Sequence, residues 1–125
     1  MANILLVDDS RSIRLMVSDT LRSVGHTILE AENGQQALEI ASKYALDLVL
    51  TDLNMPLMNG LELTRHIRTL AQHKTTPILL VTTDSQLSKK QEAKEAGANG
   101  WVVKPIPPQK LLLVVNKVLG ITVLA

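Results

Sequence analysis

Four short apolar runs in this chain are each followed by a polar residue that can handle phosphate or a metal ion. The runs cover residues 4–7, 46–50, 78–81 and 101–103, and the polar residues after them are Asp8 with Asp9, Asp52, Thr82 and Lys104. If the runs are parallel strands of one sheet, their carboxyl ends meet at one edge, where open α/β sheets bind ligands. Taken alone, Asp52 could merely begin an Asx-type turn. The convergence of all these groups favours a functional site.

These residue types suit phosphoryl transfer assisted by a hard cation. Clustered carboxylates repel one another unless one is protonated or a cation lies between them. Oxygen ligands without His or Cys favour Mg²⁺, which binds a few carboxylates together with phosphate oxygens. With the metal in place, the carboxylate of Asp52 can attack a phosphoryl group in line and form an acyl phosphate. The Thr82 hydroxyl and the Lys104 ammonium would then bind phosphoryl oxygens.

The stretches between the apolar runs predict the elements that position these groups. Apolar residues recur at helical spacing in residues 13–24, 35–44, 63–70 and 108–119, residues 88–96 read as a polar helix, and residues 26–31 as a further strand. Alternation of strands and helices is typical of βα units around a parallel sheet, whose central strands are apolar throughout because both faces are covered. We therefore predict an α/β fold with five strands and five helices.

Length and composition indicate one folded domain over residues 1–125. Hydrophobic residues make up 46% of the chain and charged residues 20%, and the net charge of +1 gives no global attraction to nucleic acid or anionic membranes. The absence of Cys excludes disulfides, thiolate metal sites and thiol catalysis, and suits a reducing cytosol. We expect no signal peptide, because the N-terminus reaches Asp8 and Asp9 after one short apolar run, and no stretch approaches the roughly 18 apolar residues of a membrane span.

The polar set resembles the receiver domain of two-component response regulators, most closely the single-domain chemotaxis regulators of the CheY type. The matching residues are Asp8-Asp9, Asp52 within Asp-Leu-Asn-Met-Pro-Leu-Met-Asn-Gly, Thr82 and Lys104-Pro105, in family order and at fitting spacings over essentially the whole chain. The resemblance implies a flavodoxin-like, doubly wound sheet with strand order 2-1-3-4-5. It also implies a single receiver domain without an output domain, so that output occurs through protein binding.

The same resemblance assigns roles at the strand ends. Asp52 would accept a phosphoryl group from the phosphohistidine of a sensor histidine kinase. Asp9 and Asp52, with the backbone carbonyl of Asn54, would hold Mg²⁺, and Asp8 would help through water. Thr82 and Lys104 would contact the phosphoryl group and couple it to the distant surface.

Trp101 occupies the position at which the family has an aromatic residue that changes rotamer as the Thr moves inward. Its alternative role is to fill an edge of the core, because Trp is usually well buried. Chemotaxis regulators present the fourth helix, fifth strand and fifth helix to their targets. Lys89, Lys90 and Lys94 fall on the predicted fourth helix, although a solvated charged face is the more common use of such residues.

The resemblance further implies the partners: a histidine kinase, a downstream protein such as a flagellar motor switch, and a phosphatase. It implies no nucleic-acid or membrane partner, a monomer, a cytoplasmic location, and catalysis of the protein's own phosphorylation and dephosphorylation only. A single-domain phosphorelay intermediate, passing phosphate to another histidine protein, is the alternative role. The sequence names neither the kinase nor the target.

Some positions modify what the resemblance implies. Thr83 stands where the family usually has a smaller residue, and Ile106 where many relatives have Phe, so access to the phosphate and packing beneath the loop are expected to differ. Asn54 and Asp84 occupy positions that tune phosphate loss and suggest a short-lived phosphoryl state. The apolar residues 123–125 either pack on the domain or fray.

Two other function classes have less support. A phosphatase with an aspartyl-phosphate intermediate needs a second acid two residues after the nucleophile, where this chain has Asn54, and it needs a cap domain for its substrate. A flavodoxin-like electron carrier needs aromatic residues against a flavin, and this chain has one Tyr, one Trp and no Gly-rich phosphate loop. His26, His66 and His73 share no metal-ligand spacing and are expected at the surface or partly buried.

Overall fold

The structure is a computed structural model that describes residues 2–83 and 87–121. One parallel sheet contains β1 (Asn3–Val7), β2 (Thr27–Ala31), β3 (Leu48–Asp52), β4 (Ile78–Thr82) and β5 (Gly100–Val103). The strands lie in the order β2-β1-β3-β4-β5, with parallel pairing between neighbours. The predicted α/β fold and its strand order are therefore confirmed.

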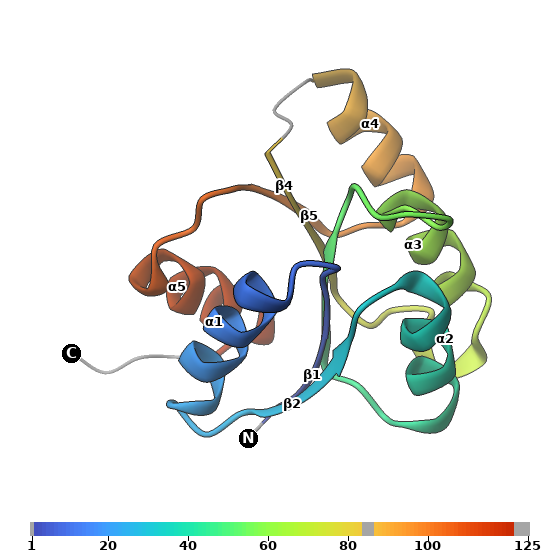
Figure 1. Cartoon of the computed structure of the whole chain (residues 1–125). Coiled ribbons are helices and arrows are strands. Elements are labelled where there is room, and N and C mark those ends of the chain that lie inside the picture. The colour runs from blue at the N-terminus through green and yellow to red at the C-terminus, as the bar shows by residue number, and fades with distance from the viewer. Residues whose placement is uncertain (1, 84–86, 122–125) are drawn as a thin grey trace.

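Helices cover both faces of the sheet. They are α1 (Arg11–Arg22), α2 (Gly34–Lys43), α3 (Gly60–Arg68), α4 (Leu87–Ala96) and α5 (Pro108–Leu119). Helices α1 and α5 lie on one side of the sheet and α2, α3 and α4 on the other, which is the doubly wound arrangement (Figure 1). A 3-10 helix, η1 (Ala71–His73), follows α3 and was not predicted from the sequence. Among the described residues, no helix has both the length and the apolar character needed to cross a membrane.

Two layers of apolar side chains, one on each face, hold the helices to the sheet. Successive side chains of a strand point to opposite faces of the sheet. Leu5 and Val7 of β1 therefore pack in the layer between the sheet and the helices α2 and α3. Ile4 and Leu6 pack in the other layer, against α1 and α5. Strand β3 is buried along its whole length. The central strands are thus fixed on both faces, and only their ends reach the surface.

Side-chain caps fix where the loops at the carboxyl edge of the sheet turn into helices. Ser10 and Asn33 each accept a hydrogen bond from the main-chain amide three residues further on, at the starts of α1 and α2. Asn59 and Glu62 form a reciprocal capping box at the start of α3. These bonds satisfy amides that have no partner within a helix, and so define the loops that carry the polar residues.

Two of the three histidines are more buried than the sequence predicted. His73 is fully buried, because its Nδ1 lies 2.9 Å from Thr76 Oγ1 and its Nε2 lies 2.8 Å from the carbonyl oxygen of Ala41. His26 is also buried, and this burial lowers its pKa. His66 is exposed, as expected. Asp84 and the apolar tail 123–125 lie outside the described residues, so the expectations made for them stay predictions.

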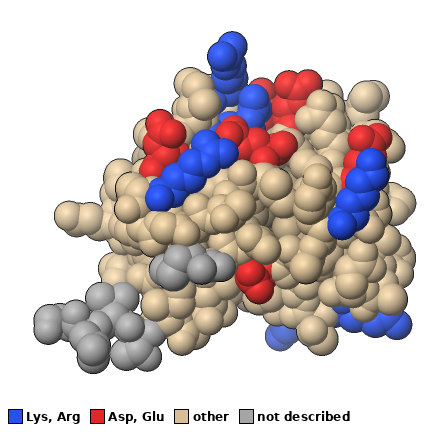
Figure 2. All heavy atoms as spheres, turned by 90° about the horizontal axis from the view of Figure 1, so that it is seen from below, with Lys and Arg blue, Asp and Glu red and all other residues tan. Residues whose placement is uncertain are grey.

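The surface carries charges of both signs. Figure 2 shows the face of the molecule that lies at the bottom of Figure 1. On this face Lys and Arg side chains lie beside Asp and Glu side chains, and uncharged residues occupy most of the remaining area. Mixing of the two signs agrees with the net charge of +1.

Candidate functional site

The structure brings the predicted polar residues to one edge of the sheet. Asp8 and Asp9 follow β1 directly, Asp52 is the last residue of β3, Thr82 is the last residue of β4, and Lys104 follows β5. The strand register aligns these ends, since Val7 pairs with Thr51, Asp52 with Val81, and Thr82 with Val103. The predicted strand 46–50 is shifted toward the site, so Asp52 belongs to the ladder and not to the loop after it.

Three carboxylates form an acidic cluster at this edge. One oxygen from each of Asp8, Asp9 and Asp52 lies within 4.8 Å of the others. Asp8 and Asp52 are buried, whereas Asp9 is exposed to solvent. The donor set is all oxygen and is partly open to water, which fits a hard cation such as Mg²⁺ that keeps several waters. Sequence reasoning therefore found the acidic residues that the structure places together.

Lys104 provides the positive charge of the site. Its Nζ lies 3.1 Å from Asp8 Oδ2 and 3.5 Å from Asp52 Oδ1. The Lys104 side chain is mostly buried, with 15% of its surface exposed, so water screens these ion pairs little. Burial raises the pKa of Asp52, and the ammonium of Lys104 opposes this rise, while Asp8 and Asp9 add to it. Lys104 thus favours the ionised form of Asp52, which is the form that can act as a nucleophile.

Thr82 and Trp101 lie on the same face of the sheet. Leu80 of β4 lies beside Trp101 of β5, and both side chains pack on the side of the sheet covered by α3 and α4. Thr82, two residues after Leu80 on the same strand, points to that side as well. Thr82 is completely buried, and its carbonyl oxygen accepts a hydrogen bond from the Lys104 amide at 2.7 Å. Trp101 is partly buried against the apolar cluster that contains Leu80. Either role expected for Trp101, rotamer switch or edge of the core, is compatible with this position.

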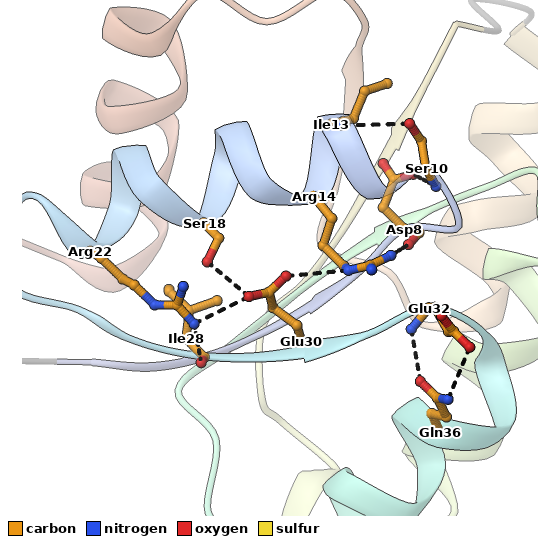
Figure 3. Close-up of polar contacts among 10 residues, drawn as sticks. All are labelled: Asp8, Ser10, Ile13, Arg14, Ser18, Arg22, Ile28, Glu30, Glu32 and Gln36. Carbon is orange, nitrogen blue, oxygen red and sulfur yellow. Dashed lines mark hydrogen bonds and ion pairs between the residues drawn. The ribbon is translucent and has the colours of Figure 1, made fainter.

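A polar network that sequence reasoning missed holds the loop after β1. Arg14 Nη1 donates to the Asp8 carbonyl oxygen at 2.7 Å, and Arg14 Nε donates to Glu30 Oε1 at 3.2 Å. Glu30 Oε2 also accepts from Ser18 and from Arg22 (Figure 3). The spacing of Arg14, Ser18 and Arg22 by four residues on α1 is the signal in the sequence, because such positions share one helix face. The network ties α1 and β2 to the main chain of Asp8.

The loop after β3 is held close to the strand end. The Gly60 amide donates to the Leu53 carbonyl at 2.8 Å, and a Cβ added to Gly60 would lie 2.5 Å from the carbonyl oxygen of Asp52. In the same loop Leu57 has a positive φ of 71° and a fully exposed side chain. Asn54 is exposed, and its predicted role as a metal ligand through the backbone carbonyl stays a prediction.

Comparison with known proteins gives the class of this chain. Residues 4–116 match the family described as the response regulator receiver domain. The chain therefore belongs to that family.

Individual relatives agree with this assignment. The chain is 40% identical over 119 residues to the chemotaxis protein CheY homolog of Campylobacter jejuni, covering 94% of this chain and 92% of that protein. It is 37% identical over 120 residues to protein PilH of Pseudomonas aeruginosa, covering 96% and 99% of the two chains.

Solved structures are similar as well. The chemotaxis response regulator CheY4 of Vibrio cholerae is 47% identical with a TM-score of 0.91, over 94% of this chain and 98% of that chain. The receiver domain of sensor histidine kinase PA1611 from P. aeruginosa, solved with magnesium coordinated in its active site cleft, is 27% identical with a TM-score of 0.88, over 95% and 98% of the two chains.

Proposed function

We propose that this receiver domain is a two-component response regulator in which Asp52 accepts a phosphoryl group from the phosphohistidine of a sensor histidine kinase. The observation that carries the proposal is the position of Asp52, which is buried at a strand end beside two further carboxylates and 3.5 Å from an ammonium. Transfer of a phosphoryl group to a carboxylate requires positive charge near the phosphoryl oxygens. At this site Lys104 supplies an ammonium, and the three carboxylates could hold a metal ion.

The chain's own groups divide the work of the transfer. A carboxylate oxygen of Asp52 forms the new bond to phosphorus as the bond from phosphorus to the histidine nitrogen breaks. Lys104, held by Asp8 before the reaction, is within reach of a phosphoryl oxygen on Asp52. Asp8, Asp9, Asp52 and the Asn54 carbonyl would hold Mg²⁺, which when bound neutralises charge on the transferring group.

The expected output is a change in affinity for a protein target. In the proposal, Thr82 and Trp101 transmit the modification to the surface formed by α4, β5 and α5, as the family resemblance implies. Lys90 and Lys94 are exposed on α4, and Lys89 is paired with Glu92 at 3.9 Å. This surface is therefore accessible to a partner.

Chemotaxis is the pathway that the relatives favour. Several matched proteins are named chemotaxis proteins, and the similar structure from V. cholerae is a chemotaxis response regulator. These names support a chemotaxis role over the alternative of a phosphorelay intermediate. The identity of the kinase, a flagellar motor target, a phosphatase partner, the monomeric state, a cytoplasmic location and the single-domain organisation of residues 1–125 all stay predictions. So does the limit of catalysis to the protein's own phosphorylation and dephosphorylation.

The test is phosphorylation by acetyl phosphate with and without Mg²⁺, followed by intact-mass and peptide mass spectrometry. One added phosphoryl group on Asp52 is expected, only with Mg²⁺, and none in Asp52→Asn. Asp47→Asn is the matched control, because this exposed acid lies at the opposite end of β3 and should be labelled like the wild type. A label on another residue, or a label that persists in Asp52→Asn, contradicts the assignment.

A further inference from the structure

The guanidinium of Arg68, at the end of α3, uses each of its five N–H groups. Its Nη1 donates to the carbonyl oxygens of His73 at 2.7 Å and Thr76 at 2.6 Å. Both Nε and Nη2 donate to the carbonyl oxygen of Gly97, at 3.0 and 2.9 Å, and Nη2 also donates to Asn99 Oδ1 at 2.8 Å. All these acceptors are uncharged oxygens, and burial lowers the pKa of Arg68. This half-buried cation therefore holds segments of main chain together.

The bonds of Arg68 join the carboxyl end of α4 to the start of β4. Gly97 directly follows α4, and its φ of 106° is a conformation that favours glycine. Asn99 directly precedes β5, its amide donates to the carbonyl of Ile78 at 2.8 Å, and its Oδ1 accepts from the Ile78 amide at 2.9 Å. Ile78 is the first residue of β4. The turn between α4 and β5 is therefore fixed to α3 and to the sheet.

The rest of α4 is held less firmly. Of residues 88–96, the part of α4 whose side chains the structure describes, only Ala93 and Ala96 are buried, and both lie in the carboxyl half. An alanine side chain buries little apolar surface, so these two contacts contribute little. Residues 88–92 are exposed or half-buried. Figure 1 shows the same asymmetry, because α4 meets α3 with its carboxyl end while its amino end lies away from the other helices.

We propose that Arg68 is a positioning residue for the response to phosphorylation: it fixes the carboxyl end of α4, so that α4 turns about this end when Asp52 is modified. The inference rests on the proposed function, in which Thr82 transmits the modification. The amino end of α4 is the end that follows Thr82 in the chain. The loosely packed end of α4 thus receives the movement, and the end fixed by Arg68 is the pivot.

Arg68 lies at the edge of the sheet opposite the acidic cluster. Its bonds to Thr76 and Asn99 lie just before β4 and β5 begin, whereas Thr82 is the last residue of β4. A strand of five residues spans about 15 Å, so Arg68 does not reach a phosphoryl group at the other edge. Loss of Arg68 should therefore change how α4 moves without preventing the chemistry at Asp52.

The test is a pair of distances between spin labels, measured by electron spin resonance. Because the chain has no Cys, labels can be placed at single introduced cysteines. One label is at Glu39→Cys on α2 and the other at Ser88→Cys or Glu95→Cys, near the two ends of α4, and all three positions are exposed. Each pair is measured with Mg²⁺ alone and with Mg²⁺ and beryllofluoride, which stands in for a phosphoryl group on a carboxylate.

The pivot predicts unequal changes in the two distances. Along the helix axis, Ser88 lies about 12 Å from Ala96 and Glu95 about 1.5 Å from it, so beryllofluoride should change the distance from Ser88 about 5-fold more, or greater, than the distance from Glu95. In Arg68→Met, which keeps a long apolar side chain but has no guanidinium, the two changes should become similar.

Matched variants separate this role from a general effect on the fold. Arg65→Met, at an exposed arginine of the same helix, should give the wild-type ratio of the two changes. Asn99→Ala removes one acceptor of Arg68 and should give an intermediate ratio, which keeps the test available if Arg68→Met does not fold. Labelling of Asp52 by acetyl phosphate, followed by mass spectrometry, should be equal in all these proteins.

The outcomes distinguish the pivot from the proposed function. If the wild type is not labelled at Asp52, the proposed function fails and the pivot fails with it. If Asp52 is labelled but the two wild-type distances change equally or not at all, the pivot alone is overturned. The same holds if Arg68→Met or Asn99→Ala folds and keeps the wild-type ratio.

Discussion

Arg14 donates a hydrogen bond from Nη1 to the main-chain carbonyl oxygen of Asp8 at a distance of 2.7 Å. The same guanidinium is fixed by Glu30 on β2, and its side chain is only 14% exposed. The loop after β1, which carries Asp8 and Asp9, therefore does not depend on β1 alone for its position. A residue on α1, which contributes no ligand to the acidic cluster, sets the conformation of the main chain between the two acids Asp8 and Asp9.

The first prediction concerns this positioning role. Arg14→Gln should weaken Mg²⁺ binding by about 10-fold, the usual cost of removing a group that orients metal ligands. Calorimetric titration with Mg²⁺ measures the effect, and thermal unfolding with EDTA records any loss of stability separately. Arg11→Gln, an exposed arginine at the start of the same helix, is the matched control and should bind Mg²⁺ like the wild type. Equal affinities for both variants would show that Arg14 is merely structural.

The second prediction is a pH dependence of stability. Burial raises the pKa of Asp52, so the folded protein keeps a proton there at a pH at which the unfolded chain has released it. The free energy of unfolding then decreases as the pH rises from the ordinary Asp value through the raised value. Asp52→Asn removes this contribution and should be more stable than the wild type above that window. The difference should disappear below the ordinary pKa of Asp.

Urea unfolding with EDTA, at several pH values from acid to neutral, measures this difference between Asp52→Asn and the wild type. Asp47→Asn serves as the comparison, because Asp47 is exposed. A gap between Asp52→Asn and the wild type that stayed constant over the whole pH range would rule out ionisation of Asp52 as its cause.

The third prediction concerns the strained loop after β3. Leu57 has a φ of 71° and buries no side-chain surface, so the fold gains nothing from leucine at this position. Left-handed backbone costs an ordinary residue about 1–2 kcal/mol, and Asn tolerates it better. Leu57→Asn should therefore raise the free energy of unfolding by about 1 kcal/mol. Leu113→Asn, at an exposed position inside a helix, should lower it slightly, since Asn is a weaker helix former than Leu. A destabilised Leu57→Asn protein would contradict this account.

The fourth prediction compares two glycines at helix starts. A Cβ at Gly60 would meet the carbonyl oxygen of Asp52, which is main chain of a buried strand and cannot move easily. A Cβ at Gly34 would meet the side chain of Met58, whose Sδ and Cγ can turn away, although its Cβ, at 2.9 Å, can move only with the main chain of the exposed loop. Gly60→Ala should therefore cost about 1–3 kcal/mol of stability and Gly34→Ala clearly less. Denaturant unfolding of the two variants decides between them, and equal losses would mean that the main chain at Asp52 adapts as readily as the Met58 side chain.

The acidic edge was predictable from the sequence because its chemistry lies at the ends of apolar runs. Buried parallel strands have to be apolar on both faces, so the first polar residues after them, such as Asp8 and Lys104, mark the sheet edge without further information. Pairing of Asp52 with the strand ladder was less predictable, because strand boundaries depend on the register with β1 and β4. That register is set by contacts between segments far apart in the chain.

The features that were missed depend on side-chain partners. An arginine on a helix is usually solvated, and the four-residue spacing of Arg14, Ser18 and Arg22 indicates a shared helix face but not the hydrogen bond from Arg14 to the Asp8 carbonyl. His73 is polar and lies in a polar stretch, yet it is buried because Thr76 and the Ala41 carbonyl satisfy its ring nitrogens. A cavity of about 270 Å³ beside Ile106 lies between α1 and the segment that joins β5 to α5. It depends on how these elements pack, and the sequence indicated only that packing near Ile106 would differ from that of relatives.

The place of Asp52 as the final residue of a completely buried strand has a mechanical consequence. Its main chain is fixed by apolar side chains on both faces and by pairing with β4, so the strand would not retreat if the proposed dianionic phosphoryl group were attached to Asp52. Room for that group has to come from the flanking turns, which carry Asp9, Asn54 and Lys104. If Asp52 is phosphorylated as proposed, the structural response begins in these turns and at Thr82, the last residue of β4, while β1 and β3 at the centre of the sheet stay in place.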